Sequence, residues 1–148
     1  MTTNPAVIRV ESMIIAPNAD LSAHAVIAFP PSRTNPDGFH RLIGGSVEVG
    51  ETGIEAIHRE VDEAIGAVIH DLRHLTVLES IFQAESGVGH EVVFLFTGRL
   101  DPTPAATGAT MTEADGTVFP LVWRPFDQEL PPPLFPAATG DWLREVAG

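Results

Sequence analysis

The chain has 148 residues and a formal net charge of −12, and all eight of its basic residues are arginines. This length is typical of one folded domain, so we expect a single domain over residues 1–148. So large an excess of acid argues against a polymeric nucleic acid as partner, which would require a basic face. The absence of cysteine excludes disulfides, thiolate metal ligands and a thiol nucleophile.

Hydrophobic patterning predicts mainly strands with one central helix. The expected strands cover residues 6–17, 21–31, 39–45, 75–85, 90–101 and 117–126. The expected helices cover residues 53–67 and 139–147, and Thr139 is a candidate N-cap for the second helix. Residues 102–116 and 127–136 are rich in proline, glycine and small polar residues, so we expect loops there.

Neither end of the chain carries a membrane signal. The first residues lack a basic segment followed by an apolar core, and no apolar run reaches about 18 residues. We therefore expect a cytoplasmic protein that does not enter a membrane.

The helix expected at residues 53–67 has local start and stop signals. Thr52 and Glu55 have the T-x-x-E spacing of a capping box, and Gly66 suits the left-handed position beyond the last turn. Four apolar residues recur at helical spacing and should form its core face: Ile54, Ile57, Val61 and Ile65.

Two carboxylates of this helix converge. At about 100° per residue, Glu60 and Glu63 lie about 60° apart, and Ala64 lies about 40° to the other side of Glu60. Arg59 projects about 100° away from Glu60, so we expect a bound cation rather than an arginine between the acids. Mg²⁺ suits oxygen ligands of this kind. The alternative is a solvated acidic helix face, which is what charge runs usually form.

The spacing of residues 45–67 also matches a known motif. The stretch GSVEVGETGIEAIHREVDEAIGA resembles the Nudix box, G-x5-E-x7-R-E-U-x-E-E-x-G-U, in which U is a bulky apolar residue. The flanking stretches FHRLIGG and LESIFQAESGVGHEVVFLF are similar to one branch of that family. The resemblance covers roughly residues 20–145, and it implies an α+β fold: an α/β/α sandwich in which a mixed sheet lies between helices and the box forms loop, helix and loop.

The resemblance implies a reaction and a set of roles. Members hydrolyse a nucleoside diphosphate linked to another moiety, using Mg²⁺ or Mn²⁺ and water, because a pyrophosphate must be neutralised before a nucleophile can approach. Glu60 would be a metal ligand or the general base, Glu63 a metal ligand and Gly44 a ligand through its carbonyl oxygen. Arg59 would pair with Glu51 and brace the loop against the helix.

Ala64 departs from the motif, since the family places a metal-binding glutamate there. A replacement ligand or base is Glu91, from outside the box; the alternative for Glu91 is a solvent-facing residue at a strand start. Two functions follow: a hydrolase with a weakened metal site, or a Nudix-fold nucleotide-binding module that has lost catalysis. An acidic protein-interaction helix is a third, less favoured interpretation.

Other residues support more than one interpretation. Arg41 would contact a substrate phosphate or pair with a nearby acid. Trp123 and Phe126 are interpreted as core residues rather than base-stacking groups because they lie in an apolar strand. The expected partner is a small nucleotide-type pyrophosphate, selected by residues 30–40 and 101–116. The sequence leaves a homodimer open.

Overall fold

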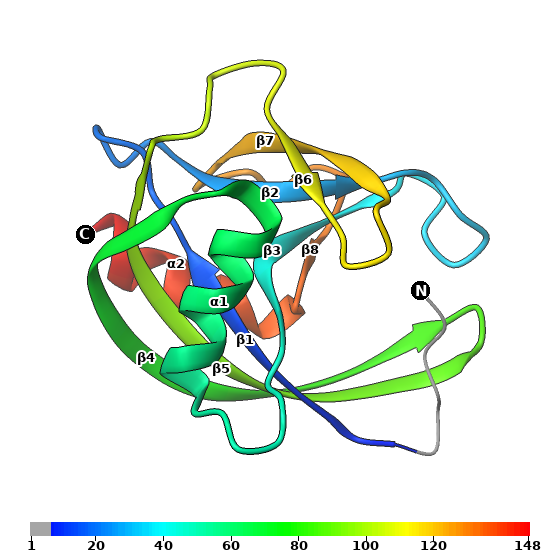
Figure 1. Ribbon diagram of the computed structural model, residues 1–148. Coiled ribbons are helices and arrows are strands. Elements are labelled where there is room, and N and C mark those ends of the chain that lie inside the picture. Colours follow the sequence, from blue (N-terminus) through cyan, green and yellow to red (C-terminus); the bar gives the residue numbers. More distant parts are fainter. Residues whose placement is uncertain (1–6) are drawn as a thin grey trace.

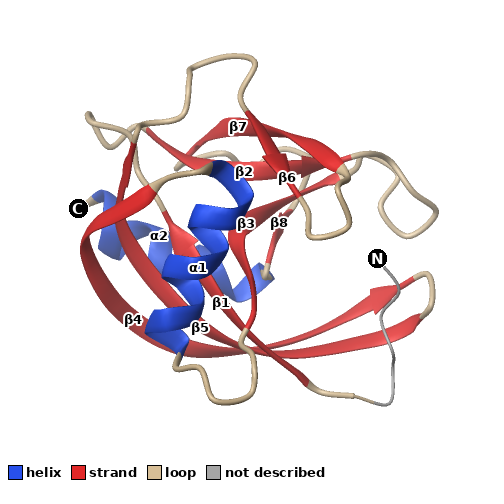
Figure 2. Cartoon of the chain, in the orientation of Figure 1, coloured by secondary structure: helices blue, strands red, loops and turns tan. Residues whose placement is uncertain are grey.

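The computed structural model describes residues 7–148, so Ala6, the first residue of the expected first strand, lies outside the described part. Over these residues the chain forms a mixed eight-stranded sheet with two α-helices (Figures 1 and 2). Its strands are β1 (Arg9–Ile15), β2 (Ala23–Phe29), β3 (Phe39–Ser46), β4 (Val68–Ala84), β5 (Gly87–Asp101), β6 (Thr110–Thr112), β7 (Val118–Pro125) and β8 (Leu134–Phe135).

The order of strands across the sheet is β4-β5-β1-β3-β2-β7-β6, and β8 pairs with β3. Strand β1 lies between β5, which runs parallel to it, and β3, which runs antiparallel. In this register Glu11 is opposite Ser46 on β3 and opposite Val93 on β5. Strand β1 therefore joins the first half of the chain to the long β4–β5 hairpin.

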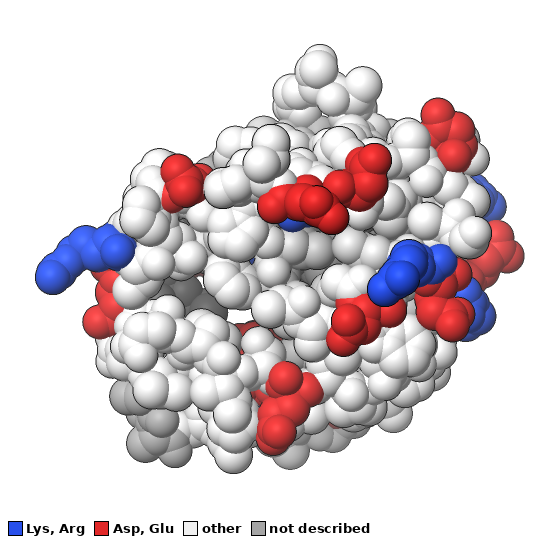
Figure 3. Space-filling view, turned by 180° about the vertical axis from the view of Figure 1, so that it is seen from behind, with Lys and Arg blue, Asp and Glu red and all other residues white. Residues whose placement is uncertain are grey.

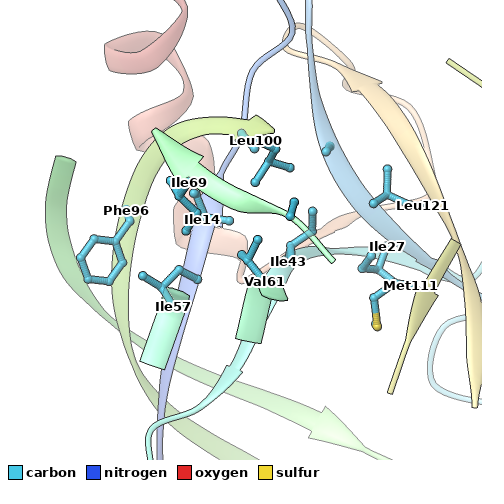
Figure 4. Packing of buried hydrophobic residues seen from close by; sticks show 13 residues of the cluster. Ile14, Ile27, Ile43, Ile57, Val61, Ile69, Phe96, Leu100, Met111 and Leu121 are labelled. Carbon is cyan, nitrogen blue, oxygen red and sulfur yellow. The ribbon is translucent and has the colours of Figure 1, made fainter. Parts of the chain in front are cut away.

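The two helices cover opposite faces of the sheet. Helix α1 (Gly53–Ile65) packs through Ile57 and Val61 onto one apolar cluster, which Figure 4 shows around Ile14 and Phe96. Helix α2 (Gly140–Ala147), with the short 3₁₀ turn η1 (Ala137–Thr139) before it, packs on a second cluster through Trp142, Leu143 and Val146. Because successive strand residues point to opposite faces, each central strand contributes to both clusters.

This architecture confirms the α+β fold expected from the sequence, with a mixed sheet between helices and a loop-helix-loop segment beside it. Helix α1 begins at Gly53 as predicted but ends at Ile65, two residues before the expected end at residue 67. Thr52 and Glu55 form both bonds of the capping box, and Gly66 has the left-handed conformation with φ 65°.

Three predictions of secondary structure are corrected. Strand β4 begins at Val68 rather than Leu75, because pairing with β5 continues through residues 68–74, past two register shifts. Strands β6 and β8 lie within the two segments expected to be loops. Both are two or three residues long, and pairing with β7 and β3 forms them despite their weak local pattern.

Two side chains are placed differently from expectation. Thr139 does not cap α2: its backbone is already helical, and its buried hydroxyl has no hydrogen-bond partner. Ile54 is 53% exposed and does not join the core face of α1. Position 54 lies in the first turn of the helix, where spacing alone does not show whether the sheet is in reach.

Neither helix of residues 7–148 has the length and apolar character that a membrane-spanning helix requires.

Candidate active site

The N-terminal end of α1 is fixed against β1 and β3. Ser12 on β1 donates from its hydroxyl to the carbonyl oxygen of Gly53, at 2.8 Å. The carboxylate of Glu60 lies against Gly45 on β3, where a β-carbon on Gly45 would overlap it. The glycine thus leaves room for an acidic side chain between the helix and the sheet.

Arg59 connects the loop before α1 to the acids of the helix. Its Nε and Nη2 donate to the two carboxylate oxygens of Glu51, at 2.7 and 2.9 Å, and Nη2 also donates to the carbonyl oxygen of Ser46. The predicted pairing of Arg59 with Glu51 is confirmed. Hydrogen bonds from Arg59 lower the pKa of Glu51 to about 2, so Glu51 stays ionised at neutral pH.

Arg59 also contacts two acids of α1, which the helix geometry did not predict. Its Nη1 donates to Glu60 Oε1 at 3.0 Å and to Glu63 Oε2 at 3.2 Å, so an arginine lies between the two acids. The prediction that Arg59 projects away was wrong because it followed the direction of the Cα–Cβ bond. The guanidinium is at the end of a long flexible stem and reaches around the helix.

A buried carboxyl group on β1 joins this site, and the sequence analysis missed it. Glu11 is 4% exposed, and its carboxyl group shares a hydrogen bond with Glu91 on β5. Two carboxyl groups can share such a bond only when one of them holds a proton. Burial, and then the bond to Glu91 and its charge, raise the pKa of Glu11 to about 8.

Glu60 belongs to the same acidic group as Glu11 and Glu91. Burial raises the pKa of Glu60, Arg59 lowers it, and the negative charges of Glu63 and Glu11 raise it further. Glu91 is partly buried within β5, and it raises the pKa of Glu11. Figure 3 shows acidic groups spread over the back of the molecule and a hollow with acidic atoms at its floor.

Only one weak signal could have revealed Glu11. The residue stands within the apolar strand sequence RVESMII, where a charged residue in the middle of a buried strand is unusual. Its neighbours, however, are set by the pairing of β1 with β5, whose residues are about 80 positions away. Residue spacing within a single strand or helix cannot predict which two strands will pair.

Arg41 pairs with a nearby acid, which is one of the two environments expected for it. It pairs with Glu113 at 3.6 Å, and its guanidinium lies 5.0 Å from the centre of the Phe29 ring. Its positive charge also lowers the pKa of Glu11, which places it near the acidic group. The Nε atom of Arg41 is buried without a hydrogen-bond partner, so part of the donor capacity of this arginine is unused.

Glu63 and Ala64 differ in environment. The side chain of Glu63 is 57% exposed and remains accessible beside Arg59. Ala64 is partly buried and packs against the apolar cluster that contains Ile57 and Val61. The replacement for the expected glutamate therefore contributes to packing between α1 and the sheet.

Trp123 and Phe126 are partly buried and lie against the apolar core, as expected, without being fully enclosed in it. Trp123 packs against the cluster under α1, and Phe126 against the cluster under α2. The indole Nε1 of Trp123 donates to the carbonyl oxygen of Ala105, which satisfies its polar atom.

The acidic residues suit a hydrated hard cation rather than a closed metal cage. Within residues 7–148, no three acidic or histidine side chains are gathered closely enough to hold a metal ion as they stand. All the available donors are carboxylate and carbonyl oxygens, and Mg²⁺ usually binds to one or two carboxylates while keeping several waters. This donor set fits Mg²⁺ or Mn²⁺, with waters and a substrate completing the coordination.

Two cavities of about 320 and 280 Å³ lie along the loop between β2 and β3. The first lies between Arg33 in that loop and Glu85 at the tip of the β4–β5 hairpin, and Glu85 accepts a hydrogen bond from the backbone nitrogen of Arg33. The acidic group does not line either cavity.

The family model described as NUDIX domain matches residues 24–146. The chain belongs to the NUDIX domain family. A comparison with curated protein sequences gives no match.

Several solved structures have a similar fold. A MutT NUDIX hydrolase from Burkholderia pseudomallei has 23% sequence identity and a TM-score of 0.66, with 95% of this chain and 98% of that chain covered. The dihydroneopterin triphosphate pyrophosphohydrolase of E. coli has 21% identity and a TM-score of 0.58, with 81% and 84% covered. An ADP compounds hydrolase has 18% identity and a TM-score of 0.58, with 95% and 72% covered. At these identities the likeness establishes the fold.

Proposed function

We propose that this protein is a divalent-metal-dependent hydrolase that cleaves the pyrophosphate linkage of a small nucleotide-type substrate. The observation that carries the proposal is the acidic group on α1, in which the Glu60 carboxylate lies against Gly45 and accepts a hydrogen bond from Arg59. Family membership supports the same reaction class. The structures of similar fold include proteins described as acting on dihydroneopterin triphosphate and on ADP compounds.

Each residue of the site would have a distinct role in such a reaction. Glu60, Glu63 and the carbonyl oxygen of Gly44 would hold Mg²⁺ or Mn²⁺. When bound, the metal neutralises the pyrophosphate and lowers the pKa of a water molecule. Glu91 accepts a proton from the attacking water or adds a carboxylate to the metal site. Arg41, whose side chain is 19% exposed and lies 3.6 Å from Glu113, would contact a substrate phosphate through its terminal nitrogens.

The pair Glu51 and Arg59 has a supporting role. Their two parallel hydrogen bonds fix the loop before α1 relative to the helix, and Arg59 also binds the carbonyl oxygen of Ser46 just after the glycine pair. This network sets the distance between the carbonyl of Gly44 and the acids of α1. A bidentate arginine pair is well suited to hold such geometry.

A second function is a nucleotide-binding module without catalysis. Ala64 favours it, because alanine cannot ligate a metal at a position where the family motif has glutamate. Such a module would bind nucleotides at the same acidic group and release no product.

The decisive experiment compares the wild type with Glu60→Gln in a screen of nucleoside triphosphates, dinucleoside polyphosphates and nucleotide sugars, with Mg²⁺ or Mn²⁺ present. Coupled phosphatase reports the phosphate released. We expect turnover by the wild type and a loss of at least about 100-fold in Glu60→Gln, since the variant removes a charged ligand or base.

The matched control is Glu145→Gln, which also removes one negative charge but lies exposed on α2. It should keep wild-type turnover, and both variants should keep the wild-type melting temperature within a few degrees. Full turnover in Glu60→Gln would contradict the assignment of the reaction to this acidic group. Nucleotide binding by the wild type with no turnover on any substrate would favour the binding module.

A further inference from the structure

The β4–β5 hairpin extends beyond α1, and the helix covers only part of one of its faces (Figure 1). The start of α1 lies over this face at Phe94, since a β-carbon on Gly53 would be 3.0 Å from the Phe94 ring. Beside and beyond Phe94, five large apolar side chains are 40–63% exposed. We call them the hairpin patch; they are Ile8 just before β1, Val10 on β1, Val77 and Ile81 on β4, and Val88 on β5.

The strand register places the strand members of the hairpin patch on one face of the sheet. Val10 is opposite Val92 on β5, and Val92 is opposite Glu79 on β4. Successive strand residues point to opposite faces, so this face carries residue 10 of β1, residues 77, 79 and 81 of β4, and residues 88, 90 and 92 of β5. Glu91 lies on the other face of β5, so the hairpin patch is distinct from the candidate active site.

The composition of this face is unusual for one that meets water. An antiparallel hairpin with one solvated face normally alternates apolar and polar residues. Here β4 is apolar on both faces, because Leu78 is buried at 8% exposure while Val77 and Ile81 are 49% and 63% exposed. Of the described strand residues on this face between positions 77 and 92, those that can carry a charge are Glu79 and His90, and they lie 3.2 Å from each other. The patch is therefore apolar around one internally paired acid.

We propose that the hairpin patch is the contact surface of a homodimer, in which two copies of this chain pack their hairpins face to face about a two-fold axis. This inference does not depend on the proposed hydrolase function.

The charge of the chain favours a second copy as the occupant of this surface. The net charge is −12, so two copies repel each other unless they meet where each surface is neutral. The hairpin patch is such a surface, because its acid Glu79 already has His90 as partner. For the same reason it offers no charge that would attract a basic or an acidic partner. In a two-fold contact the same patch meets itself, so each copy covers the exposed apolar side chains of the other.

The size of the hairpin patch indicates a weak dimer. Three strands about 4.8 Å apart, over about six residues at 3.4 Å each, give an area of roughly 300 Å². Contiguous apolar surface of about this size is often functional on a monomer. Stable interfaces bury roughly 800 Å² on each partner, so we expect reversible association in the micromolar range.

Sedimentation velocity of the full-length chain, from micromolar to millimolar concentration, tests the proposal. The wild type should change from monomer to dimer over this range. Ile81→Lys and Val88→Lys should each weaken the dimer at least about tenfold, because each places a charge in the apolar centre of the contact. The matched control is Leu130→Lys, which adds the same charge at a side chain that is 77% exposed between β7 and β8. It should associate like the wild type.

Two further measurements make the result specific to this face. Circular dichroism and thermal melting show that each variant is folded, which is expected because positions 81, 88 and 130 are exposed. Amide signals in nuclear magnetic resonance spectra of the wild type should shift with concentration in residues 77–92. A wild type that stays monomeric up to millimolar concentration would overturn the proposal. So would a dimer that Ile81→Lys and Val88→Lys leave unchanged, or one that Leu130→Lys weakens as much as they do.

Discussion

Gly44 and Gly45 are adjacent, but a side chain would meet different atoms at each. A β-carbon on Gly44 would overlap the backbone of Ser12 and Met13 on β1, which the sheet holds in place. A β-carbon on Gly45 would overlap only the end of the Glu60 side chain, which can rotate away. The first glycine is required by the fold, and the second by the site.

We therefore predict different outcomes for two matched variants. Gly44→Ala should lower the melting temperature strongly, since it separates β3 from β1. Gly45→Ala should melt within a few degrees of the wild type, yet bind Mn²⁺ at least about tenfold more weakly because Glu60 is displaced. Differential scanning calorimetry and Mn²⁺ titration measure the two effects. Equal losses of stability in the two variants would contradict this division of roles.

Single residues show where sequence reasoning succeeds and where it stops. The pairing of Arg59 with Glu51 follows from the motif and is present. The reach of Arg59 to Glu60 and Glu63 does not follow from helix angles, because a guanidinium moves independently of its backbone direction. The place of Glu11 depends on which strands are neighbours, and that is a property of the whole sheet.

Among the elements, α1 is the most strongly specified by its own sequence. Thr52 accepts from the backbone nitrogen of Glu55 at 3.1 Å, and Glu55 accepts from the backbone nitrogen of Thr52 at 2.9 Å. Together these bonds satisfy two backbone donors at the helix start. The cap also fixes the position of the turn that precedes Arg59 and Glu60.

Removal of this cap should have a modest and measurable cost. Thr52→Ala is expected to destabilise the protein by about 1 kcal/mol, which corresponds to roughly 2–4 °C in melting temperature for a chain of this size. Thr52→Ser keeps the hydroxyl and should melt close to the wild type. An unchanged melting temperature in Thr52→Ala would show that packing of Ile57 and Val61 alone determines where the helix begins.

The elements that the sequence did not predict are those formed by their partners. Strand β6 is three residues in a segment rich in glycine, alanine and threonine, and it exists because Met111 pairs opposite Phe119 of β7. Strand β8 follows a run of prolines and pairs through Leu134 with His40. The polar start of β4 is likewise held by β5. Local sequence patterns predict an element whose own apolar residues form a face that packs on the core. Strands β6 and β8 and the start of β4 have no such face.

At the scale of the whole molecule, His24 makes stability depend on pH. The side chain is fully buried, neither ring nitrogen has a hydrogen-bond partner, and the ring of Phe126 lies 5.0 Å away. Burial, and then the positive charge of Arg124 and the charge of His40, lower the pKa of His24 from 6.5 to about 4. Folding therefore favours neutral His24, and the unfolded chain takes up a proton at higher pH.

The direction in which stability changes with pH follows from this difference in pKa between the folded and unfolded chain. The stability contributed by neutral His24 is fully present above pH 6.5 and is lost as the pH falls towards 4, by up to about 3 kcal/mol. The effect of Glu11 has the opposite sign, since its raised pKa lowers stability as the pH rises from 4.5 to about 8. Urea unfolding at several pH values should show a smaller loss between pH 6.5 and 4 in His24→Leu than in the wild type, because the contribution of Glu11 is common to both. Parallel curves would contradict the assignment to His24.

The pairing of β1 with β5 also affects the order in which parts of the protein fold during synthesis. Glu11 and Glu91 are 80 positions apart in the chain, whereas Glu51, Arg59, Glu60 and Glu63 lie within 13 residues of one another. During synthesis from the N-terminus, the segment of α1 emerges before that of β5, so contacts within the arginine network can form before β1 pairs with β5. Strand β1 can pair with β3 earlier, but its pairing with β5 must wait until β5 has emerged, and closing so long a loop is slow. Until then Glu11 is exposed to water and ionised, so the carboxyl pair with Glu91 becomes buried only at a late step of folding.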